Sequence, residues 1–169
     1  MKPDRKSITQ QRVRELFDYF DGMLIRKVSR GRGKYSVRWR KGDVAGSELS
    51  YGYRGISIDY NSYKLHHIIW LWHHGSLPNG VIDHINGNKA DNRIENLRIG
   101  SHAQNCQNKR RPMITNKLGV QGVYKVNNKY RAAIHKNYKR IHIGYFDTAE
   151  EAYQAYLTQK RKLHEFNTL

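Results

Sequence analysis

The sequence predicts an α+β protein of two units, and three observations support this. Short apolar stretches alternate with turns rich in Gly and Asn, as in β-hairpins. Two segments carry helix-start signals directly after expected strands, Ser101 with Gln104 and Thr148 with Glu151. Residues 109–117 are basic and lack hydrophobic periodicity, as linkers do. The expected domains are 1–108 and 118–169, joined by this linker.

The N-terminal unit begins with Val13, Leu16, Phe17 and Phe20 at helical spacing, which predicts one amphipathic helix over residues 9–20. The elements expected after it are a strand at 23–28, a basic arm at 30–41, a hairpin at 52–66, a short buried helix ending at Gly75, strands at 81–84 and 97–100, and a helix at 101–109. The arm is compatible with an ordered hairpin or a mobile loop. The last three elements predict a ββα arrangement.

The C-terminal unit is predicted to be a three-stranded antiparallel sheet packed on one helix. The strands are expected at 120–126, 129–135 and 139–146, and the helix starts after Thr148. Alternation in the middle strand puts Tyr130, Ala132 and Ile134 on one face. That face is expected to pack on the helix, which leaves a cationic face outward.

Positive charge is concentrated along the chain. The 169 residues include 31 Lys and Arg against 14 Asp and Glu, a formal net charge of +17. Residues 22–42 hold eight basic side chains and residues 96–146 hold eleven, and neither stretch has an acid. Such single-signed runs attract a polyanion, and a merely solubilising surface would mix the two signs. The sequence therefore predicts nucleic acid as the partner.

Other classes of protein fit less well. Cys106 is the single cysteine, which excludes an internal disulfide and a Cys-rich zinc site. The apolar run at 68–72 is too short to span a membrane, and the N-terminal residues lack a signal-peptide core. We therefore expect a cytoplasmic protein with no membrane partner and no small-molecule substrate.

The stretch VIDHINGNKADNRIENLRIGSHAQN, residues 81–105, carries the chemistry. Hydrolysis of a phosphodiester needs a base for the attacking water and positive charge for the phosphate and the leaving oxygen. A histidine can be the base, and one hard divalent cation, Mg²⁺ or Mn²⁺, can supply the charge from few oxygen ligands. Asp83, His84 and Asn105 provide that set. The alternative is an Asn-rich turn with a histidine at its edge.

The same residues resemble the HNH nuclease motif, in the ββα-metal form found in homing endonucleases of phage and intron origin. The resemblance covers about residues 9–110 and rests on DHINGNKADNRIENLR followed by SHAQN. It implies Asp83 and Asn105 as metal ligands, His84 as general base and Asn96 as the asparagine that ties the loop together. The chain has His67-Ile68 where many relatives have Arg-Leu, so a possible phosphate-binding Arg is absent and the roles of His66 and His67 stay open. His102 could be an extra ligand or a solvent-facing residue.

The C-terminal unit resembles a second family, the DNA-binding domain of plant ethylene-response factors (AP-two type), mainly through GYFDTAEEA. This resemblance implies DNA contacts from the outward residues of the sheet. They are Gln121, Tyr124, Lys129, Arg131, His135, Arg140 and His142.

The predicted function is a metal-dependent HNH DNA endonuclease of the homing or free-standing phage type. It would act as a monomer on double-stranded DNA and leave 5′-phosphate and 3′-hydroxyl ends. A nick and a double-strand break both stay open, as does the target site. The rivals are a non-catalytic DNA-binding regulator and a zinc-stabilised module that uses the nine histidines.

Overall fold

The computed structural model describes residues 8–31, 37–108, 112, 115–136, 139–164 and 166–168. The chain divides into two compact units, Met1–Ile99 and Gly100–Leu169. The basic arm at 30–41 and the expected linker lie partly outside the described residues. The domain boundaries predicted from composition stay predictions. No helix in the described part of the chain is both long and apolar enough to cross a membrane.

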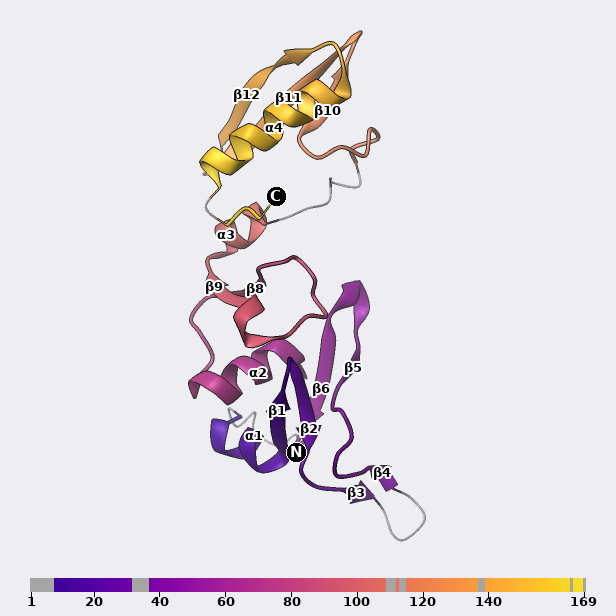
Figure 1. The fold of residues 1–169 in the computed structure, drawn as a ribbon, viewed down its shortest axis with the longest axis vertical. Helices are drawn as coiled ribbons and strands as arrows, with labels where there is room; N and C mark the ends of the chain where they lie inside the picture. The colour runs from indigo at the N-terminus through magenta and orange to yellow at the C-terminus, as the bar shows by residue number, and fades with distance from the viewer. Residues whose placement is uncertain are drawn as a thin grey trace, which may run out of the picture. The chain divides into compact units, whose positions relative to one another are not determined.

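The N-terminal unit is made of short hairpins around one buried helix (Figure 1). Its elements in order are α1 (Gln10–Leu16), β1 (Phe17–Phe20), β2 (Met23–Arg26), β3 (Arg30–Gly31), β4 (Val37–Trp39), β5 (Ser47–Glu48), β6 (Arg54–Ile58), β7 (Asn61–Lys64), α2 (Leu65–His74), β8 (Val81–His84) and β9 (Leu97–Gly100), with 3₁₀ turns at Ser50–Gly52 and Ile94–Asn96. The strands pair as β1–β2, β3–β4, β5–β6–β7 and β8–β9. The hairpin at 52–66, the helix ending at Gly75 and the strand pair at 81–84 and 97–100 agree with the prediction.

The expected helix at 9–20 is wrong in its second half. The helix stops at Leu16, and Phe17–Phe20 form a strand that pairs antiparallel with Met23–Arg26. The turn between them is Asp21-Gly22, and both residues have positive φ, 42° and 78°. A two-residue turn of this kind matches the twist of a hairpin. Residues 17–20 therefore pair with the strand that follows, although their apolar spacing also suits a helix.

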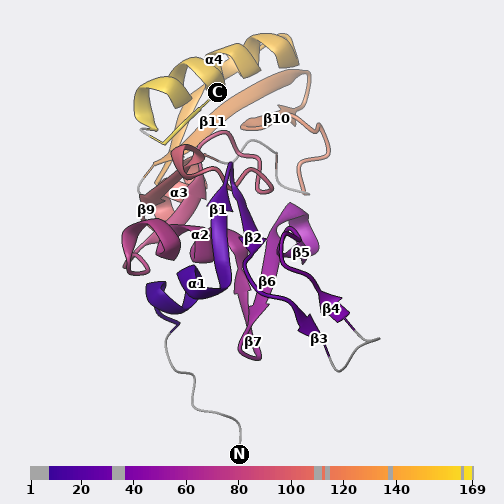
Figure 2. The ribbon, with the colours of Figure 1, turned by 60° about the horizontal axis from the view of Figure 1, so that its bottom comes forward.

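The core of this unit forms where α2 packs between the hairpins. Five residues of this core are 2% exposed or less: Val13, Phe17, Leu24, Leu65 and Ile68. The helix ends because Gly75 takes the left-handed conformation, φ 81°, and its N–H donates to Leu71 O. Helix α2 thus brings His66 into the interior and leaves His67 half-buried, beside the β8–β9 hairpin, which is drawn close to α2 in Figure 2.

The C-terminal unit contains α3 (His102–Gln107), β10 (Val123–Val126), β11 (Lys129–Lys136), β12 (Lys139–Phe146) and α4 (Ala149–Leu163). The strands form an antiparallel sheet in the order β10–β11–β12, with a register shift at Ala132/Ala133. Both predicted capping boxes are present, Ser101 with Gln104 and Thr148 with Glu151. The first strand begins at Val123, later than expected, because Gly119 and Gly122 turn the chain with φ of 71° and 75°.

Helix α4 covers one face of this sheet. Val123, Ala132, Ile134, Ala152 and Tyr156 form the buried cluster between them. Lys160 on the same helix face is also buried, and its Nζ donates to Gln121 Oε1 at 3.3 Å. The α+β architecture with a three-stranded sheet on one helix is therefore confirmed.

Candidate functional site

Two adjacent residues at the end of β8 form the centre of the candidate site. Asp83 and His84 are 7% and 3% exposed, although they are ionisable and lie next to a polar loop. Successive residues of a strand point to opposite faces. Each side chain accordingly has its own partners, Arg98 for Asp83 and Asn92 for His84. Buried ionisable groups need such partners, so the hairpin holds the two groups in defined positions.

The carboxylate of Asp83 is paired with a cation. Arg98 on β9 donates from Nε and Nη2 to Asp83 Oδ2, at 3.1 and 3.0 Å. This ion pair holds the Asp83 carboxylate in a defined position between the two strands.

Asn92 fixes the proton of the His84 ring. His84 Nε2 lies 3.1 Å from Asn92 Oδ1. The Asn92 amide is oriented by its other end, because Nδ2 donates to Ala90 O at 3.2 Å. Since Oδ1 can only accept, Nε2 carries the hydrogen and Nδ1 is the basic nitrogen of a neutral ring.

The surroundings keep His84 neutral. Burial lowers the pKa of His84, and the hydrogen bond to Asn92 and the charge of Asp83 oppose this only in part. His66 packs edge-on against His84, with ring centroids 5.0 Å apart, and burial lowers the pKa of His66 to about 3. The ring centroid of Tyr53 lies 5.6 Å from that of His66 and 6.2 Å from that of His84. A neutral imidazole at pH 7 is the form that can accept a proton.

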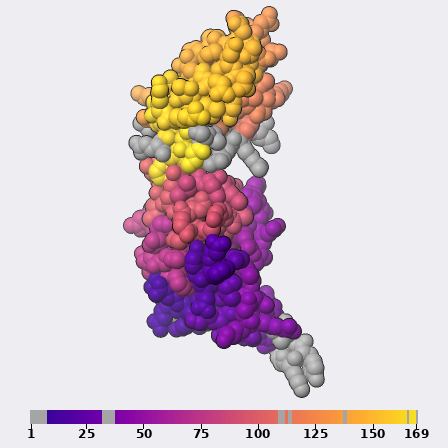
Figure 3. Space-filling model, viewed as in Figure 1, coloured from indigo at the N-terminus to yellow at the C-terminus, as the bar shows by residue number. Residues whose placement is uncertain are grey.

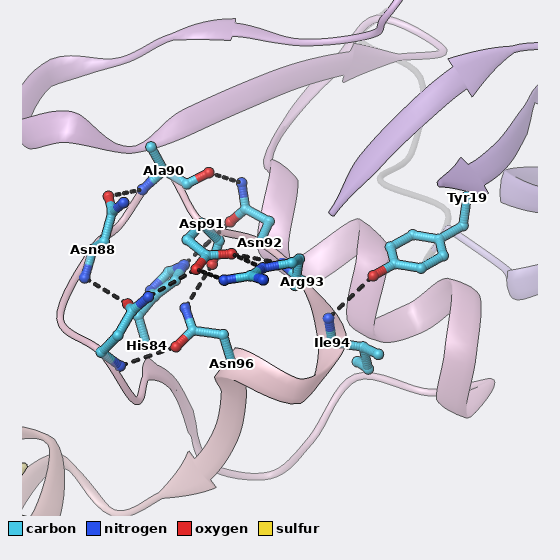
Figure 4. Close-up of polar contacts among 10 residues, drawn as sticks. Tyr19, His84, Asn88, Ala90, Asp91, Asn92, Arg93, Ile94 and Asn96 are labelled. Atoms are coloured by element: carbon cyan, nitrogen blue, oxygen red, sulfur yellow. Dashed lines mark hydrogen bonds and ion pairs between the residues drawn. The ribbon is translucent and has the colours of Figure 1, made fainter. Parts of the chain in front are cut away.

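The loop between β8 and β9 is held by its own asparagines and one aspartate (Figure 4). Asn96 Oδ1 accepts from Asn86 N at 2.9 Å, and Asn96 Nδ2 donates to Asp91 O at 2.8 Å. Asp91 accepts from Arg93 Nε and Nη2 and from Asn86 Nδ2, and the bonds to Arg93 hold its pKa well below the usual value. The Asn96 side chain thus joins the backbone at Asn86 to the backbone at Asp91 across the loop. Its role in this structure is to hold the loop together.

The hairpin β1–β2 supports the same loop from outside. Tyr19 Oη accepts from Ile94 N at 3.1 Å, as Figure 4 shows. A Cβ built on Gly22 would lie 2.7 Å from Arg93 N, so the hairpin tip fits only without a side chain. In the space-filling view the indigo atoms of the hairpin lie against those of the 81–99 segment (Figure 3).

Two lysines add positive charge beside His84. Lys64 Nζ and Lys89 Nζ lie 4.8 and 4.6 Å from the centroid of the Tyr53 ring. Lys89 also donates to Tyr51 O at 3.2 Å. In the described part of the chain neither ammonium forms an ion pair with a carboxylate. The ring therefore holds two cations next to the candidate base.

The proposed ligands suit a hard cation by their chemistry. Asp83 lies on β8 of the first unit and offers a buried carboxylate, and Asn105 lies half-buried on α3 of the second unit and offers an amide oxygen. Mg²⁺ and Mn²⁺ prefer oxygen ligands and keep several waters, so two protein ligands can suffice. His102 is exposed. In the described ranges no three His, Cys, Asp or Glu side chains come together as a metal cluster.

The seven residues expected to contact DNA divide into two groups. Tyr124, Arg131, His135, Arg140 and His142 share one face of the sheet, since Arg131 pairs with Tyr124 and His135 pairs with Arg140. On that face the guanidinium carbons of Arg131 and Arg140 lie 5.7 and 5.1 Å from the Tyr124 ring. Lys129 forms an ion pair with Asp147, and Gln121 precedes β10 and bonds to Lys160.

Sequence reasoning missed two partners of the central pair. Asn92 was one of four asparagines in the loop, and nothing in its spacing distinguishes it from its neighbours. Arg98 could have been found, because it stands on the strand expected to pair with β8, and a buried Asp there needs a cation. Tyr53 and Lys64 come from distant segments, and Lys89 of the loop itself gave no sequence signal for its contact with Tyr53.

Comparison with known proteins agrees with this geometry. Residues 63–107 match a family model described as HNH endonuclease, and this range includes Asp83, His84, Asn96 and Asn105. An uncharacterized HNH endonuclease of Acanthamoeba polyphaga mimivirus is 35% identical over 103 residues, which cover 60% of this chain and 53% of that protein. The chain thus spans about half the length of this curated relative. No solved structure matches. Residues 63–107 are thus similar to an HNH endonuclease domain.

Proposed function

We propose that this chain is a metal-dependent endonuclease that hydrolyses phosphodiester bonds of double-stranded DNA and leaves 5′-phosphate and 3′-hydroxyl ends. The observation that carries the proposal is the pair at the end of β8. A buried anion, Asp83, lies next to a neutral histidine, His84, whose basic nitrogen is set by Asn92. Both lie within the HNH match.

In this reaction His84 accepts the proton of the attacking water at Nδ1. Asn92 keeps the ring in the right tautomer and stabilises the cation that forms, since its Oδ1 accepts from Nε2. One divalent ion held by Asp83 and Asn105, Mg²⁺ or Mn²⁺, would supply charge for the phosphate and for the 3′ leaving oxygen. Lys64 and Lys89 favour the approach of the anionic backbone to the same place.

The C-terminal sheet is proposed to position the enzyme on DNA. Its outer face presents Arg131, His135, Arg140 and His142 around Tyr124, on a small sheet of the kind that the major groove admits. Most of these side chains would contact phosphates, and only two or three would touch base edges. The resemblance of this unit to the AP-two type, the homing or phage origin and action as a monomer belong to the same proposal.

The test is cleavage of supercoiled plasmid in Mg²⁺, with a gel shift on the same proteins. A general base contributes about 10²- to 10⁴-fold, so His84→Ala should bind DNA and cut it slower by that factor. Asn88→Ala is the control: it removes one loop hydrogen bond, from Ala90 N, but no partner of His84, and it should keep close to the parental rate. Cutting by His84→Ala at the parental rate would refute the role of His84. If parent and variant both bind and neither cuts with any divalent metal, the chain is a non-catalytic regulator.

A further inference from the structure

Three arginines of the N-terminal unit surround one indole ring. The guanidinium carbons of Arg26, Arg30 and Arg38 lie 4.2, 5.7 and 5.2 Å from the centroid of Trp39. Arg30 and Trp39 face each other across the β3–β4 ribbon. The base of this ribbon is tied to β2, because Arg26 N donates to Asp43 O at 3.0 Å and Gly42 N donates to Arg26 O at 2.8 Å. The cluster is therefore built on paired backbone.

The positive charge of this cluster is not balanced by ion pairs. In the described residues none of the three arginines forms a salt bridge. Two carboxylates are near. Asp59 is held by Arg12 Nε and Nη2 at 2.9 and 3.1 Å, and Asp43 Oδ2 accepts from Arg40 N at 2.7 Å. Burial lowers the pKa of Arg26, the charge of Asp43 opposes this in part, and the charge of Arg38 lowers it further.

Exposed groups extend the cluster into a surface. Arg30, Arg38, Arg40 and Lys41 are exposed on or directly after the ribbon. Tyr60, 87% exposed, comes from the β6–β7 turn, and its Oη accepts from Arg30 Nη2 at 3.1 Å. The ring of Tyr60 also lies 5.4 Å from the guanidinium of Arg30. Aromatic rings hold the guanidinium planes in place, so little side-chain freedom is lost when an anion binds.

We infer that this Trp39 surface, formed by Arg26, Arg30, Arg38, Trp39 and Tyr60, binds the phosphate backbone of double-stranded DNA outside the candidate active site. Planar guanidiniums pair with phosphate oxygens, and several fixed in a row suit the regular phosphates of a strand better than one isolated anion. Within this unit the ribbon lies away from the β8–β9 hairpin (Figures 1 and 2). The surface thus adds affinity without taking part in the chemistry. The choice of DNA over another polyanion rests on the proposed function.

The experiment measures binding of the full chain to a fluorescent duplex by anisotropy, in EDTA, over a series of salt concentrations. The slope of log K against log salt falls by about 0.9 for each phosphate that the protein no longer neutralises. Arg30→Gln and Arg38→Gln should each lower it by that amount, and the double variant by about 1.8. Lys162→Gln removes one exposed charge from α4 and is the matched control, with the parental slope expected. Trp39→Phe keeps a ring under the arginines and should bind as the parent does.

Three results would overturn the inference. One is a double variant whose slope equals that of Lys162→Gln. Another is loss of binding by Arg30→Gln or Arg38→Gln with the parental salt slope and the parental far-ultraviolet circular dichroism spectrum. The last is equal competition by polyglutamate and duplex DNA, which would point to an acidic protein partner.

Cleavage separates this inference from the proposed function. At saturating enzyme the double variant should cut plasmid at the parental single-turnover rate. If the parent never cuts but the slopes shift as stated, the proposed function fails and the Trp39 surface stands. If the parent cuts and the slopes do not shift, the Trp39 surface alone is wrong.

Discussion

At the scale of single residues, the side chain that pairs with each ionisable group decides the chemistry of that group. Asp83 and His84 are neighbours in sequence, yet one is an ion paired with Arg98 and the other is a neutral base. Their strand explains this, because it turns the two side chains to opposite sides. Any HNH-like spacing supplies the pair, but only the fold supplies Arg98 and Asn92.

Asn92 is therefore expected to act through His84. Replacing it by Ala leaves the Nε2 hydrogen of a buried ring without its acceptor and lets the other tautomer form. We expect Asn92→Ala to lower the single-turnover rate by about 10- to 100-fold, the usual loss for a partner that orients a site histidine, with unchanged affinity for DNA. Plasmid cleavage and gel shift measure both quantities. A parallel loss of binding would mean that the loop has collapsed, and Asn88→Ala controls for the loop.

His66 makes the N-terminal unit sensitive to acid. Its pKa is lowered from 6.5 to about 3, mainly by burial, so below pH 6.5 the unfolded chain binds a proton that the folded chain does not. The free energy of unfolding must then fall as pH falls, by up to about 1.4 kcal/mol per pH unit.

The test replaces His66 by Phe and compares urea unfolding at pH 7.5 and pH 5.0. Fluorescence reports this unit alone, since all three tryptophans lie in it. The parent should lose about 2 kcal/mol more than His66→Phe between the two values. Equal losses would show that His66 is protonated in the folded chain. His102→Gln, at an exposed position, should behave as the parent does.

At the scale of elements, turns and caps were more predictable than the limits of helices. The capping boxes at Ser101 and Thr148 and the glycine after α2 mark helix ends by local hydrogen bonding, and the sequence shows them directly. Phe17 and Phe20 misled because residues three apart share a face of a helix, whereas in this strand they point to opposite faces, with Phe17 buried and Phe20 66% exposed. The turn at Asp21-Gly22 was visible in the sequence, but it was taken as a helix end.

Gly22 joins this hairpin to the candidate site. Gly22→Ala would put a methyl group 2.7 Å from Arg93 N and 3.0 Å from Asn92 C, in addition to strain at φ 78°. Gly52 has the same φ with nothing within 4 Å of its Cβ position, so Gly52→Ala measures the strain alone, about 1–2 kcal/mol. We expect Gly22→Ala to be clearly less stable than Gly52→Ala and to cut DNA more slowly. Equal stability would show that the hairpin tip moves freely.

At the scale of the whole molecule, stability comes from two separate cores of ordinary apolar packing. One core lies around α2 and the hairpins, and the other lies between α4 and its sheet. The C-terminal core was predictable from alternation in the strands, but the N-terminal core was so only in part, because Val13 and Phe17 had been expected on one helix. The contacts of the candidate site were not predictable, since Tyr53 meets the His84 ring, and Lys64 and Lys89 meet the Tyr53 ring, only in the folded unit.

These cores predict how the protein responds when metal is removed. A zinc-stabilised module would depend on its ion for folding, and chelation would unfold it. In the described residues no three His, Cys, Asp or Glu side chains form a cluster that could hold a structural metal ion. We therefore expect EDTA to abolish plasmid cleavage and to leave the melting temperature within about 2 °C, since two oxygen ligands add little to either core. Cleavage should return with Mg²⁺ or Mn²⁺. A large fall in melting temperature that only Zn²⁺ reverses would contradict the metal assignment. It would also contradict the view that apolar packing alone keeps each unit folded.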